Sequence, residues 1–255
     1  MRLFTLLVLS QLIGLSVLAT VTDLDIGIAK LAGQYSQVGG DLKALSQVRC
    51  FLKTHGQDIF RPKQVAGPLG VERCNLKETI QLTNYKSLAV INFTKNSDHS
   101  RLHIFDLTNG KVHALHVGHG RFGQTDRDNT TFSEQPKRNS ILQVKHFSND
   151  KGSNASAGGF FLTGHEYEGS YGRSRVLHGL EQGINDNACE RTTVIHKSGM
   201  VSENATRRMS SGCPMVSRER INQVHALLGE GALVYTFTPE EASLSDGICG
   251  RNLLR

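Results

Sequence analysis

The sequence predicts a mostly β fold with minor helix, preceded by a small helical N-terminal region. Glycine is abundant, at 26 of 255 residues, and tryptophan is absent, which is typical of a turn-rich β protein. From Ser87 onward the apolar residues follow a strand-like period, and an Asn-Gly pair joins two of these runs. The composition, 38% hydrophobic and 20% charged, is that of a globular protein.

Residues 1–19 have the pattern of a secretory signal peptide. Arg2 precedes an apolar run that reaches Leu18, and Val17-Leu18-Ala19 supplies the small residues that a signal peptidase prefers. The alternative, an uncleaved membrane anchor, needs roughly 20 apolar residues and firmer flanking charges. No later stretch is apolar enough to span a bilayer. We therefore expect cleavage after Ala19 and a soluble mature protein in the periplasm or outside the cell.

Residues 20–84 predict a helical N-terminal appendage. Four apolar residues recur near helical spacing: Leu42, Leu45, Val48 and Leu52. Gly39-Gly40 interrupts this pattern, and the proline-containing segment FRPKQVAGPLG (60–70) ends it. Nothing in the appendage indicates chemistry, so its expected role is packing.

Residues 85–240 form the predicted second domain, which is mostly β, and a tail of residues 241–255 follows it. Strands are expected at LAVINFT (88–94), SRLHIFDL (100–107), VHALHVGHG (112–120), GGFFLTG (158–164), TTVIH (192–196) and GALVYTF (231–237). The turn TNGK (108–111) makes a hairpin of the second and third runs. INQVHALLGEG (221–231) predicts a short helix with glycine at its end.

The chain carries a net charge of +6, which suits an anionic polymer as partner. The basic residues are scattered, and neither a basic stripe nor interleaved aromatic residues are present, so nucleic acid is disfavoured. The charge therefore favours an anionic polymer of the cell envelope as the partner.

Five cysteines (Cys50, Cys74, Cys189, Cys213 and Cys249) leave one over if the others pair, as thiols tend to do in an oxidising compartment. Four cysteines allow three pairings, which the sequence does not resolve. Proximity along the chain favours Cys50–Cys74 and Cys189–Cys249. The remaining thiol is then Cys213, inside the turn SSGCPMV (210–216).

Two groups of histidines suggest chemistry. On a strand, His113 and His119 share one face while His116 points to the other, so these three do not converge on a metal ion. His196 ends a predicted strand, and Cys213 follows on a glycine turn. This order is compatible with a thiolate nucleophile and an imidazole partner, although the spacing alone is weak evidence. No metal and no other cofactor are expected.

The segments from LAVINFT (88–94) to LVYTF (233–237) resemble the catalytic domain of the murein L,D-transpeptidases (YkuD-like), in a subgroup with a Gly-Cys-Pro turn. The matching pieces occur in family order: RLHIFDLTNGKV (101–112), VGHGR (117–121), FSND (147–150), GGFFLTGHEYEG (158–169), GLEQGINDNACER (179–191), VIH (194–196), VSE (201–203) and SSGCPMV (210–216). The resemblance covers essentially the whole second domain and does not extend to residues 20–84.

The resemblance implies an L,D-transpeptidase-type β-sandwich or barrel that acts on peptidoglycan stem peptides. Such enzymes attack the carbonyl of the third residue of a donor tetrapeptide, release the terminal D-alanine and hold the peptide as a thioester. An amine of a neighbouring stem then takes the acyl group, which gives a 3-3 cross-link. By this resemblance Cys213 is the nucleophile and His196 the base. Carbapenems are expected to acylate Cys213.

The chemistry accounts for the residues of the cysteine turn. The N–H groups of Gly212 and Cys213, with Ser211 as a further candidate, are expected to stabilise the oxyanion. Family members often carry histidine or tryptophan where this chain has Ser211, and glycine or serine where it has Lys197. We therefore expect a backbone carbonyl to orient the imidazole of His196.

Five residues in matching segments are predicted to line the groove for the stem peptide: Tyr167, Ser174, Arg175, Asn187 and Arg191. Asn187 equally fits a turn, and Arg191 a structural pair. The polar segment 122–145 is longer than the family pattern, and it is interpreted as an inserted loop that is solvated, forms a lid or binds a partner. Two alternatives stay open: an L,D-carboxypeptidase or endopeptidase that edits stem peptides, and an inactive wall-binding module in which Cys213 forms a disulfide.

Overall fold

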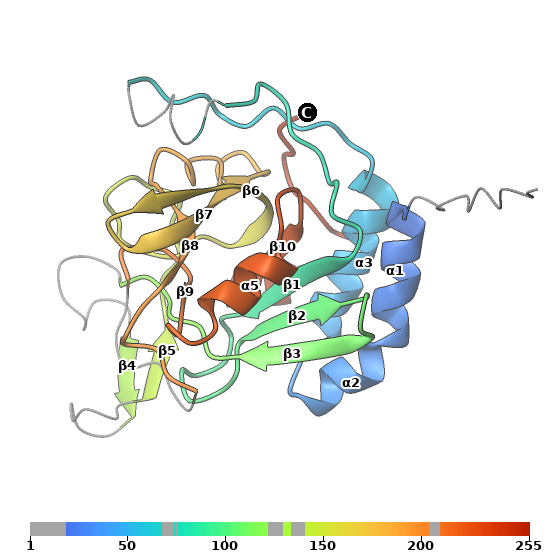
Figure 1. Ribbon diagram of the computed structural model, residues 1–255, viewed down its shortest axis with the longest axis horizontal. Coiled ribbons are helices and arrows are strands. Elements are labelled where there is room, and N and C mark those ends of the chain that lie inside the picture. Colours follow the sequence, from blue (N-terminus) through green and yellow to red (C-terminus); the bar gives the residue numbers. More distant parts are fainter. Residues whose placement is uncertain (1–18, 68–73, 75, 122–129, 134–140, 204–209) are drawn as a thin grey trace, which may run out of the picture.

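A computed structural model describes residues 19–67, 74, 76–121, 130–133, 141–203 and 210–255 (Figure 1). The predicted signal segment lies outside these residues, except for Ala19. Among the described helices, none has the length and apolar character needed to cross a membrane.

Three helices open the described chain, as the apolar spacing predicts. They are α1 (Val21–Lys30), α2 (Ala32–Gln37) and α3 (Leu42–His55). Thr20 caps α1 through a capping box with Asp23, and the Asp41 carboxylate caps α3 by accepting from the N–H groups of Lys43 and Ala44. Between α2 and α3 the chain turns at Gly39, whose φ of +85° is a conformation that favours glycine.

One eight-stranded sheet organises the rest of the fold, in the order β3-β2-β1-β10-β6-β7-β8-β9. Its strands are β1 (Ser87–Asn92), β2 (Leu102–Asp106), β3 (Lys111–Leu115), β6 (Gly159–Gly169), β7 (Gly172–Gly179), β8 (Val194–Lys197), β9 (Met215–Val216) and β10 (Leu233–Phe237). A separate hairpin pairs β4 (Thr130–Ser133) with β5 (Ile141–Val144), and two short helices, α5 (Ile221–Leu227) and α6 (Pro239–Ser243), flank β10 in the sequence. The mostly β prediction is confirmed.

The two edges of the sheet approach each other beyond β3. The Asn-Gly turn joins β2 to β3 as predicted, and the chain then runs through residues 117–121. In this segment Gly118 bridges Met215 of β9, and Gly120 bridges Ser210. The sheet is therefore nearly closed, and its closing seam is the backbone on either side of the cysteine turn.

The hairpin of β6 and β7 contains a strand that the sequence analysis did not predict. The register of the two strands shifts between Thr163 and Glu166, which marks a β-bulge. Strand β7 escaped prediction because its buried residues include the polar side chains of Ser174, Arg175 and His178, which obscure an alternating apolar pattern. The segment 122–145, expected to be an inserted loop, contains the β4–β5 hairpin, and its other residues up to 140 lie outside the described chain.

The sheet is covered on both faces. The N-terminal helices share a core with one face, in which Leu24, Tyr35 and Phe51 pack among strand residues that include Phe160 and Tyr235. Figure 1 shows α1, α2 and α3 grouped together beside the sheet. Helix α5 contributes to a second core on the other face. The helices at the N-terminus thus form a layer of the fold.

Two disulfides connect the chain, and the pairing favoured by proximity is wrong. The bonds are Cys50–Cys249 and Cys74–Cys189, with sequence separations of 199 and 115 residues. Packing brings α3 against the C-terminal tail, whereas proximity along the chain ignores this tertiary contact. Cys213 is the free cysteine, as the odd count predicts.

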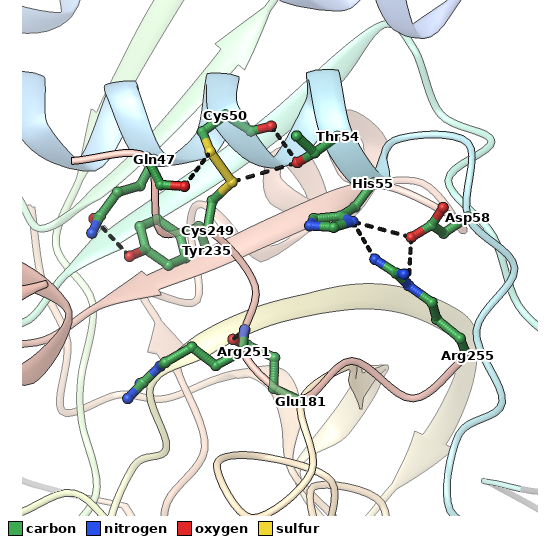
Figure 2. Close-up of a disulfide and its surroundings, with 11 residues drawn as sticks. Gln47, Cys50, Thr54, His55, Asp58, Glu181, Tyr235, Cys249, Arg251 and Arg255 are labelled. Carbon is green, nitrogen blue, oxygen red and sulfur yellow. Dashed lines mark hydrogen bonds and ion pairs between the residues drawn. A yellow bond between two sulfur atoms is a disulfide. The ribbon is translucent and has the colours of Figure 1, made fainter. Parts of the chain in front are cut away.

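Figure 2 shows how the C-terminal tail is fastened to α3 and to the sheet. Beside the Cys50–Cys249 bond, the N–H of Arg251 donates to the buried Glu181 carboxylate at 2.6 Å. A second N–H, that of Phe160, donates to the same carboxylate at 2.6 Å. Burial raises the pKa of Glu181 to about 7, against the lowering effect of these two donors.

We expect the double variant Cys50→Ala/Cys249→Ala to lose about 2–5 kcal/mol of unfolding free energy, because the bond closes a very long loop and restricts the unfolded chain. Guanidinium unfolding of the oxidised proteins measures this loss. A thiol count that still shows Cys74 and Cys189 oxidised serves as the control. An unchanged unfolding midpoint would contradict the expected stabilisation.

Candidate active site

A groove of about 880 Å³ lies against the cysteine turn and the end of β8. It is lined by residues from the β6–β7 turn, the loop before β8, β8 itself, the cysteine turn and α5. The lining includes Arg121, Tyr167, Tyr171, Arg173, Arg191, Thr192, Val194, His196, Lys197, Ser211, Cys213 and Arg218. The free thiol and the predicted base therefore open into one cavity.

Hydrogen bonds from both sides hold the cysteine turn. The hydroxyl of Ser210 accepts from the N–H of Gly212 at 3.0 Å and donates to the carbonyl of Cys213 at 2.7 Å. Outside the turn, the hydroxyl of Ser156 donates to the Gly212 carbonyl at 3.2 Å. Gly212 has a φ of +120°, in a region that side-chain-bearing residues rarely adopt. The turn is thus fixed in a conformation that glycine makes accessible.

His196 is placed by the parallel pairing of β8 with β9, in which it lies opposite Met215. Met215 is two residues after Cys213, so this pairing places His196 beside the cysteine turn. The Nδ1 atom lies 2.9 Å from the carbonyl of Lys197. Because a carbonyl only accepts, Nδ1 carries the proton and the lone pair of the neutral ring is on Nε2. A backbone carbonyl therefore orients the imidazole, as the departures from the family pattern predict.

Tyr171 covers the imidazole of His196. The two rings stack with centroids 4.4 Å apart and an interplanar angle of 25°. Tyr171 lies in the turn between β6 and β7 and is 60% exposed. Burial lowers the pKa of His196, and its contact with the Lys197 carbonyl opposes this effect. The imidazole is accordingly kept neutral to lower pH than a free histidine.

The thiol of Cys213 is half-buried and faces the chain that leads into β8. Its Sγ donates to the carbonyl of Thr192 at 3.6 Å. Burial raises the pKa of the thiol, while the N–H of Val194 and the guanidinium of Arg191 lower it. No hydrogen bond within the described chain joins this Sγ to His196. The resting group is a protonated thiol.

The backbone donors near the thiol differ from the prediction. The N–H of Gly212 is occupied by the Ser210 hydroxyl, so it is not free to bind an oxyanion. Among the described residues, the N–H groups of Ser211 and Cys213 have no hydrogen-bond partner. The sequence missed the occupied donor because the Ser210 contact depends on how the turn folds back on itself.

The predicted substrate residues divide into three groups. Tyr167 and Arg191 line the groove. Ser174 is 1% exposed and lies between Tyr167 and His196 in the sheet register. Two other residues are engaged outside the groove. Arg175 is buried against Glu166 and the Gly164 carbonyl, and Asn187 bonds to Asn149 and Lys63.

Several groove residues were not predicted: Arg121, Tyr171, Arg173, Lys197 and Arg218. Of these, Tyr171 was the most accessible to sequence reasoning, because Ser-Tyr-Gly (170–172) has the composition of a turn that ends the run after GGFFLTG. The three histidines of the HALHVGH segment each have a separate contact: His113 with Gln223, His116 with the Ser97 carbonyl and His119 with Arg101. Within the described chain no three potential ligands gather into a metal site.

Gly212→Ala is expected to lower the activity of the site about 100-fold. A Cβ at this position would lie 2.8 Å from both the Ala155 carbonyl oxygen and Arg191 Nη2, so the turn has to move. Displacement of a nucleophile by about 1 Å costs a factor of this order. Steady-state kinetics measures the loss.

Gly152→Ala is the matched control for this substitution. Gly152 also has a positive φ, of +81°, but a Cβ there would meet nothing within 4 Å. The control therefore carries the backbone strain without the collision and should keep its activity. Equal activity in the two variants would contradict the requirement for glycine at position 212.

Comparisons with known proteins identify the family of this chain. A family model described as the L,D-transpeptidase catalytic domain matches residues 70–237. No curated protein matches the sequence. A solved L,D-transpeptidase from Mycobacterium smegmatis is 10% identical, with a TM-score of 0.33, and the alignment covers 60% of this chain and 59% of that one.

Two further solved structures give similar values. An L,D-transpeptidase from Xylanimonas cellulosilytica is 15% identical with a TM-score of 0.32, and the alignment covers 59% of this chain and 60% of that one. L,D-transpeptidase 3 from Mycobacterium tuberculosis, in complex with a faropenem-derived adduct, is 9% identical with a TM-score of 0.32, at 60% coverage of both chains. The chain thus spans about three fifths of the length of these structures.

Proposed function

Because this chain belongs to the L,D-transpeptidase catalytic-domain family, we propose that it forms 3-3 cross-links in peptidoglycan through a thioester on Cys213. The donor is a tetrapeptide stem. The observation that carries this proposal is the free thiol that shares one groove with an imidazole whose Nε2 is unprotonated. A cysteine and a histidine so placed are the components of nucleophilic acyl transfer.

In the first half of the reaction, His196 Nε2 takes the proton from the thiol and Sγ attacks the carbonyl carbon of the third stem residue. The negative charge moves to the carbonyl oxygen, for which the N–H of Cys213 is a donor that the turn leaves available. Collapse of this intermediate breaks the C–N bond to the terminal D-alanine. The imidazolium returns its proton to the departing amine, which leaves a thioester.

In the second half, an amine of a neighbouring stem attacks the thioester carbonyl. His196 accepts the proton of this amine, the new amide forms, and Cys213 leaves as the thiolate and is reprotonated. Water in place of the amine gives a shortened stem, which is the carboxypeptidase alternative. The same residues serve both outcomes, so the acceptor decides between them.

The charge of the groove supports a substrate with carboxylates. Five basic side chains line it: Arg121, Arg173, Arg191, Lys197 and Arg218. No aspartate or glutamate is among its described lining residues. Of the five, Arg173 is paired with Glu166. Stem peptides carry free carboxylates, which such a groove attracts.

The two disulfides support export to an oxidising compartment. We propose that residues 1–19 direct this export and that residues 85–240 carry the catalytic site. The periplasm or the cell exterior is also where peptidoglycan is accessible.

Incubation of the purified protein with disaccharide-tetrapeptides tests the proposal. A cross-linked dimer that lacks one D-alanine, identified by mass, is the expected product. Disaccharide-tripeptide without dimer would favour the carboxypeptidase alternative. Neither product would overturn the proposed acyl transfer.

A further inference from the structure

A further charge acts on the nucleophile from outside the Cys213–His196 pair. Arg191 lies in the loop before β8, and its guanidinium points at the cysteine turn. A Cβ added to Gly212 would lie 2.8 Å from Arg191 Nη2, so the charge is in contact with the residue that precedes the nucleophile. The cation and the thiol also interact electrostatically.

The guanidinium is held in place by backbone carbonyls. Nη1 donates to the carbonyl of Ser148 at 2.6 Å, and Nη2 donates to the carbonyl of Ala155. Its own loop is fixed by the Cys74–Cys189 disulfide, which ends two residues before it. Arg191 is therefore a rigid cation, with little freedom to follow a substrate.

The charge of Arg191 is not neutralised by direct pairing. Its hydrogen bonds go to neutral carbonyls, and within the described chain no carboxylate forms an ion pair with it. Asp150 acts on it only at longer range. Arg191 is half-buried, and a cation taken partly out of water without a paired anion is costly, so one that is built into a groove indicates that an anion forms beside it.

The thiol is the group that becomes anionic there. Burial disfavours its ionisation, and the resting Sγ donates to the Thr192 carbonyl, which also favours the protonated form. Thr192 has a φ of +54°, a conformation that is rare for a residue other than glycine. Within this loop the Thr192 carbonyl thus favours the protonated thiol, and the Arg191 cation favours the thiolate that the reaction requires.

We propose that the guanidinium of Arg191 stabilises the thiolate of Cys213 while His196 holds the proton. The proposed function is what gives this role its use in the protein. The claim itself concerns only the ionisation of the Cys213 thiol. The balance is simple: Sγ–H loses its proton to Nε2 of His196, and the negative charge that remains on sulfur lies beside the guanidinium. The proton transfer therefore creates two charges: His196 carries the positive one, and Arg191 stabilises the negative one on sulfur.

Other charged and titratable groups share the cavity with this thiol. His196 comes from β8 and Tyr167 from β6, and the remaining cations of the lining are Arg121, Arg173, Lys197 and Arg218. Among all the cations of the lining, Arg191 is the one that lowers the pKa of Cys213. Removal of Arg191 should accordingly have an effect that removal of a distant cation lacks.

Alkylation of the single free thiol tests the proposal without any transpeptidase assay. The rate with iodoacetamide is measured from pH 5 to 11 in wild type, Arg191→Gln, Arg191→Lys and, as a control outside the groove, Arg220→Gln. We expect Arg191→Gln to shift the thiol titration upward by about one unit and to slow alkylation at pH 7 about tenfold. Arg191→Lys should recover most of the rate, and Arg220→Gln should match wild type.

Two results would overturn the proposal. One is an Arg191→Gln profile that coincides with wild type. The other is an Arg191→Lys variant as slow as Arg191→Gln, which would assign Arg191 to holding the Ser148 and Ala155 carbonyls. Thermal melting checks that the variants are folded. Failure of the stem-peptide assay would leave this titration unaffected, so the two proposals fail separately.

A measurement on the unmodified protein covers the case in which the variants do not fold. Anionic iodoacetate is compared with neutral iodoacetamide, first in the native protein and then in urea without reductant. A fixed cation beside Sγ predicts a higher iodoacetate-to-iodoacetamide rate ratio in the native state. An equal or lower native ratio would contradict it.

Discussion

Cys213→Ala is expected to reduce acyl transfer from tetrapeptide donors by about 10⁴-fold or more, because no other described group in the groove can form the thioester. Cys213 is the free cysteine, so the substitution leaves both disulfides intact. The rate of dimer formation, followed by mass, measures the loss. A carbapenem provides an independent readout: wild type should gain the mass of one molecule, and the variant should gain none.

The control for Cys213→Ala is a thermal melt, which shows whether the variant is folded. The alanine removes a half-buried sulfur and none of the hydrogen bonds of the Ser210 hydroxyl, so the melting temperature should stay close to that of wild type. Dimer formation at an undiminished rate in a folded variant would exclude Cys213 as the nucleophile.

His196→Gln is expected to lower the rate by about 10²–10⁴-fold, the usual contribution of a positioned general base. Glutamine keeps a polar group near the Lys197 carbonyl but cannot accept the thiol proton at neutral pH. His99→Gln is the matched control, because His99 is an exposed loop histidine far from the groove lining. A folded His196→Gln variant with the activity of His99→Gln would contradict the assignment of the base.

The pH dependence of wild type follows from the same residue. The base works when the imidazole is neutral, and burial lowers the pKa of His196 below its usual 6.5. The acid limb of the rate profile should therefore fall below pH 6.5, and activity should be retained on acidification until the pH passes the lowered pKa. This limb should vanish in His196→Gln. An acid limb above pH 6.5 would show that another group titrates.

The nature of the elements near the nucleophile was predictable from local patterns. The Asn-Gly pair identified the β2–β3 hairpin, and the odd cysteine count identified the free thiol at position 213. Both signals are local or numerical, and they do not depend on how distant segments pack. The resemblance to a known family then connected Cys213 with His196, which the spacing of the two residues alone supported weakly.

Other features depend on tertiary structure and could not be predicted. The disulfide partners are decided by the packing of α3 against the tail and of residue 74 against the loop before β8. Arg175 lies in a segment that matches the family, yet the register of β6 and β7 pairs it with Glu166, and its side chain is buried there. The stack of Tyr171 on His196 joins a turn to a strand end, and no periodicity encodes such a contact.

The position of β10 has a consequence for how the protein folds. This strand lies between β1, with which it is parallel, and β6, with which it is antiparallel. A chain that ends before Leu233 thus lacks the strand that pairs with both β1 and β6, and β1 gains its second neighbour only from the last strand of the sequence. Contacts of such long sequence separation are slow to form. The central sheet is completed only after nearly the whole chain has been made.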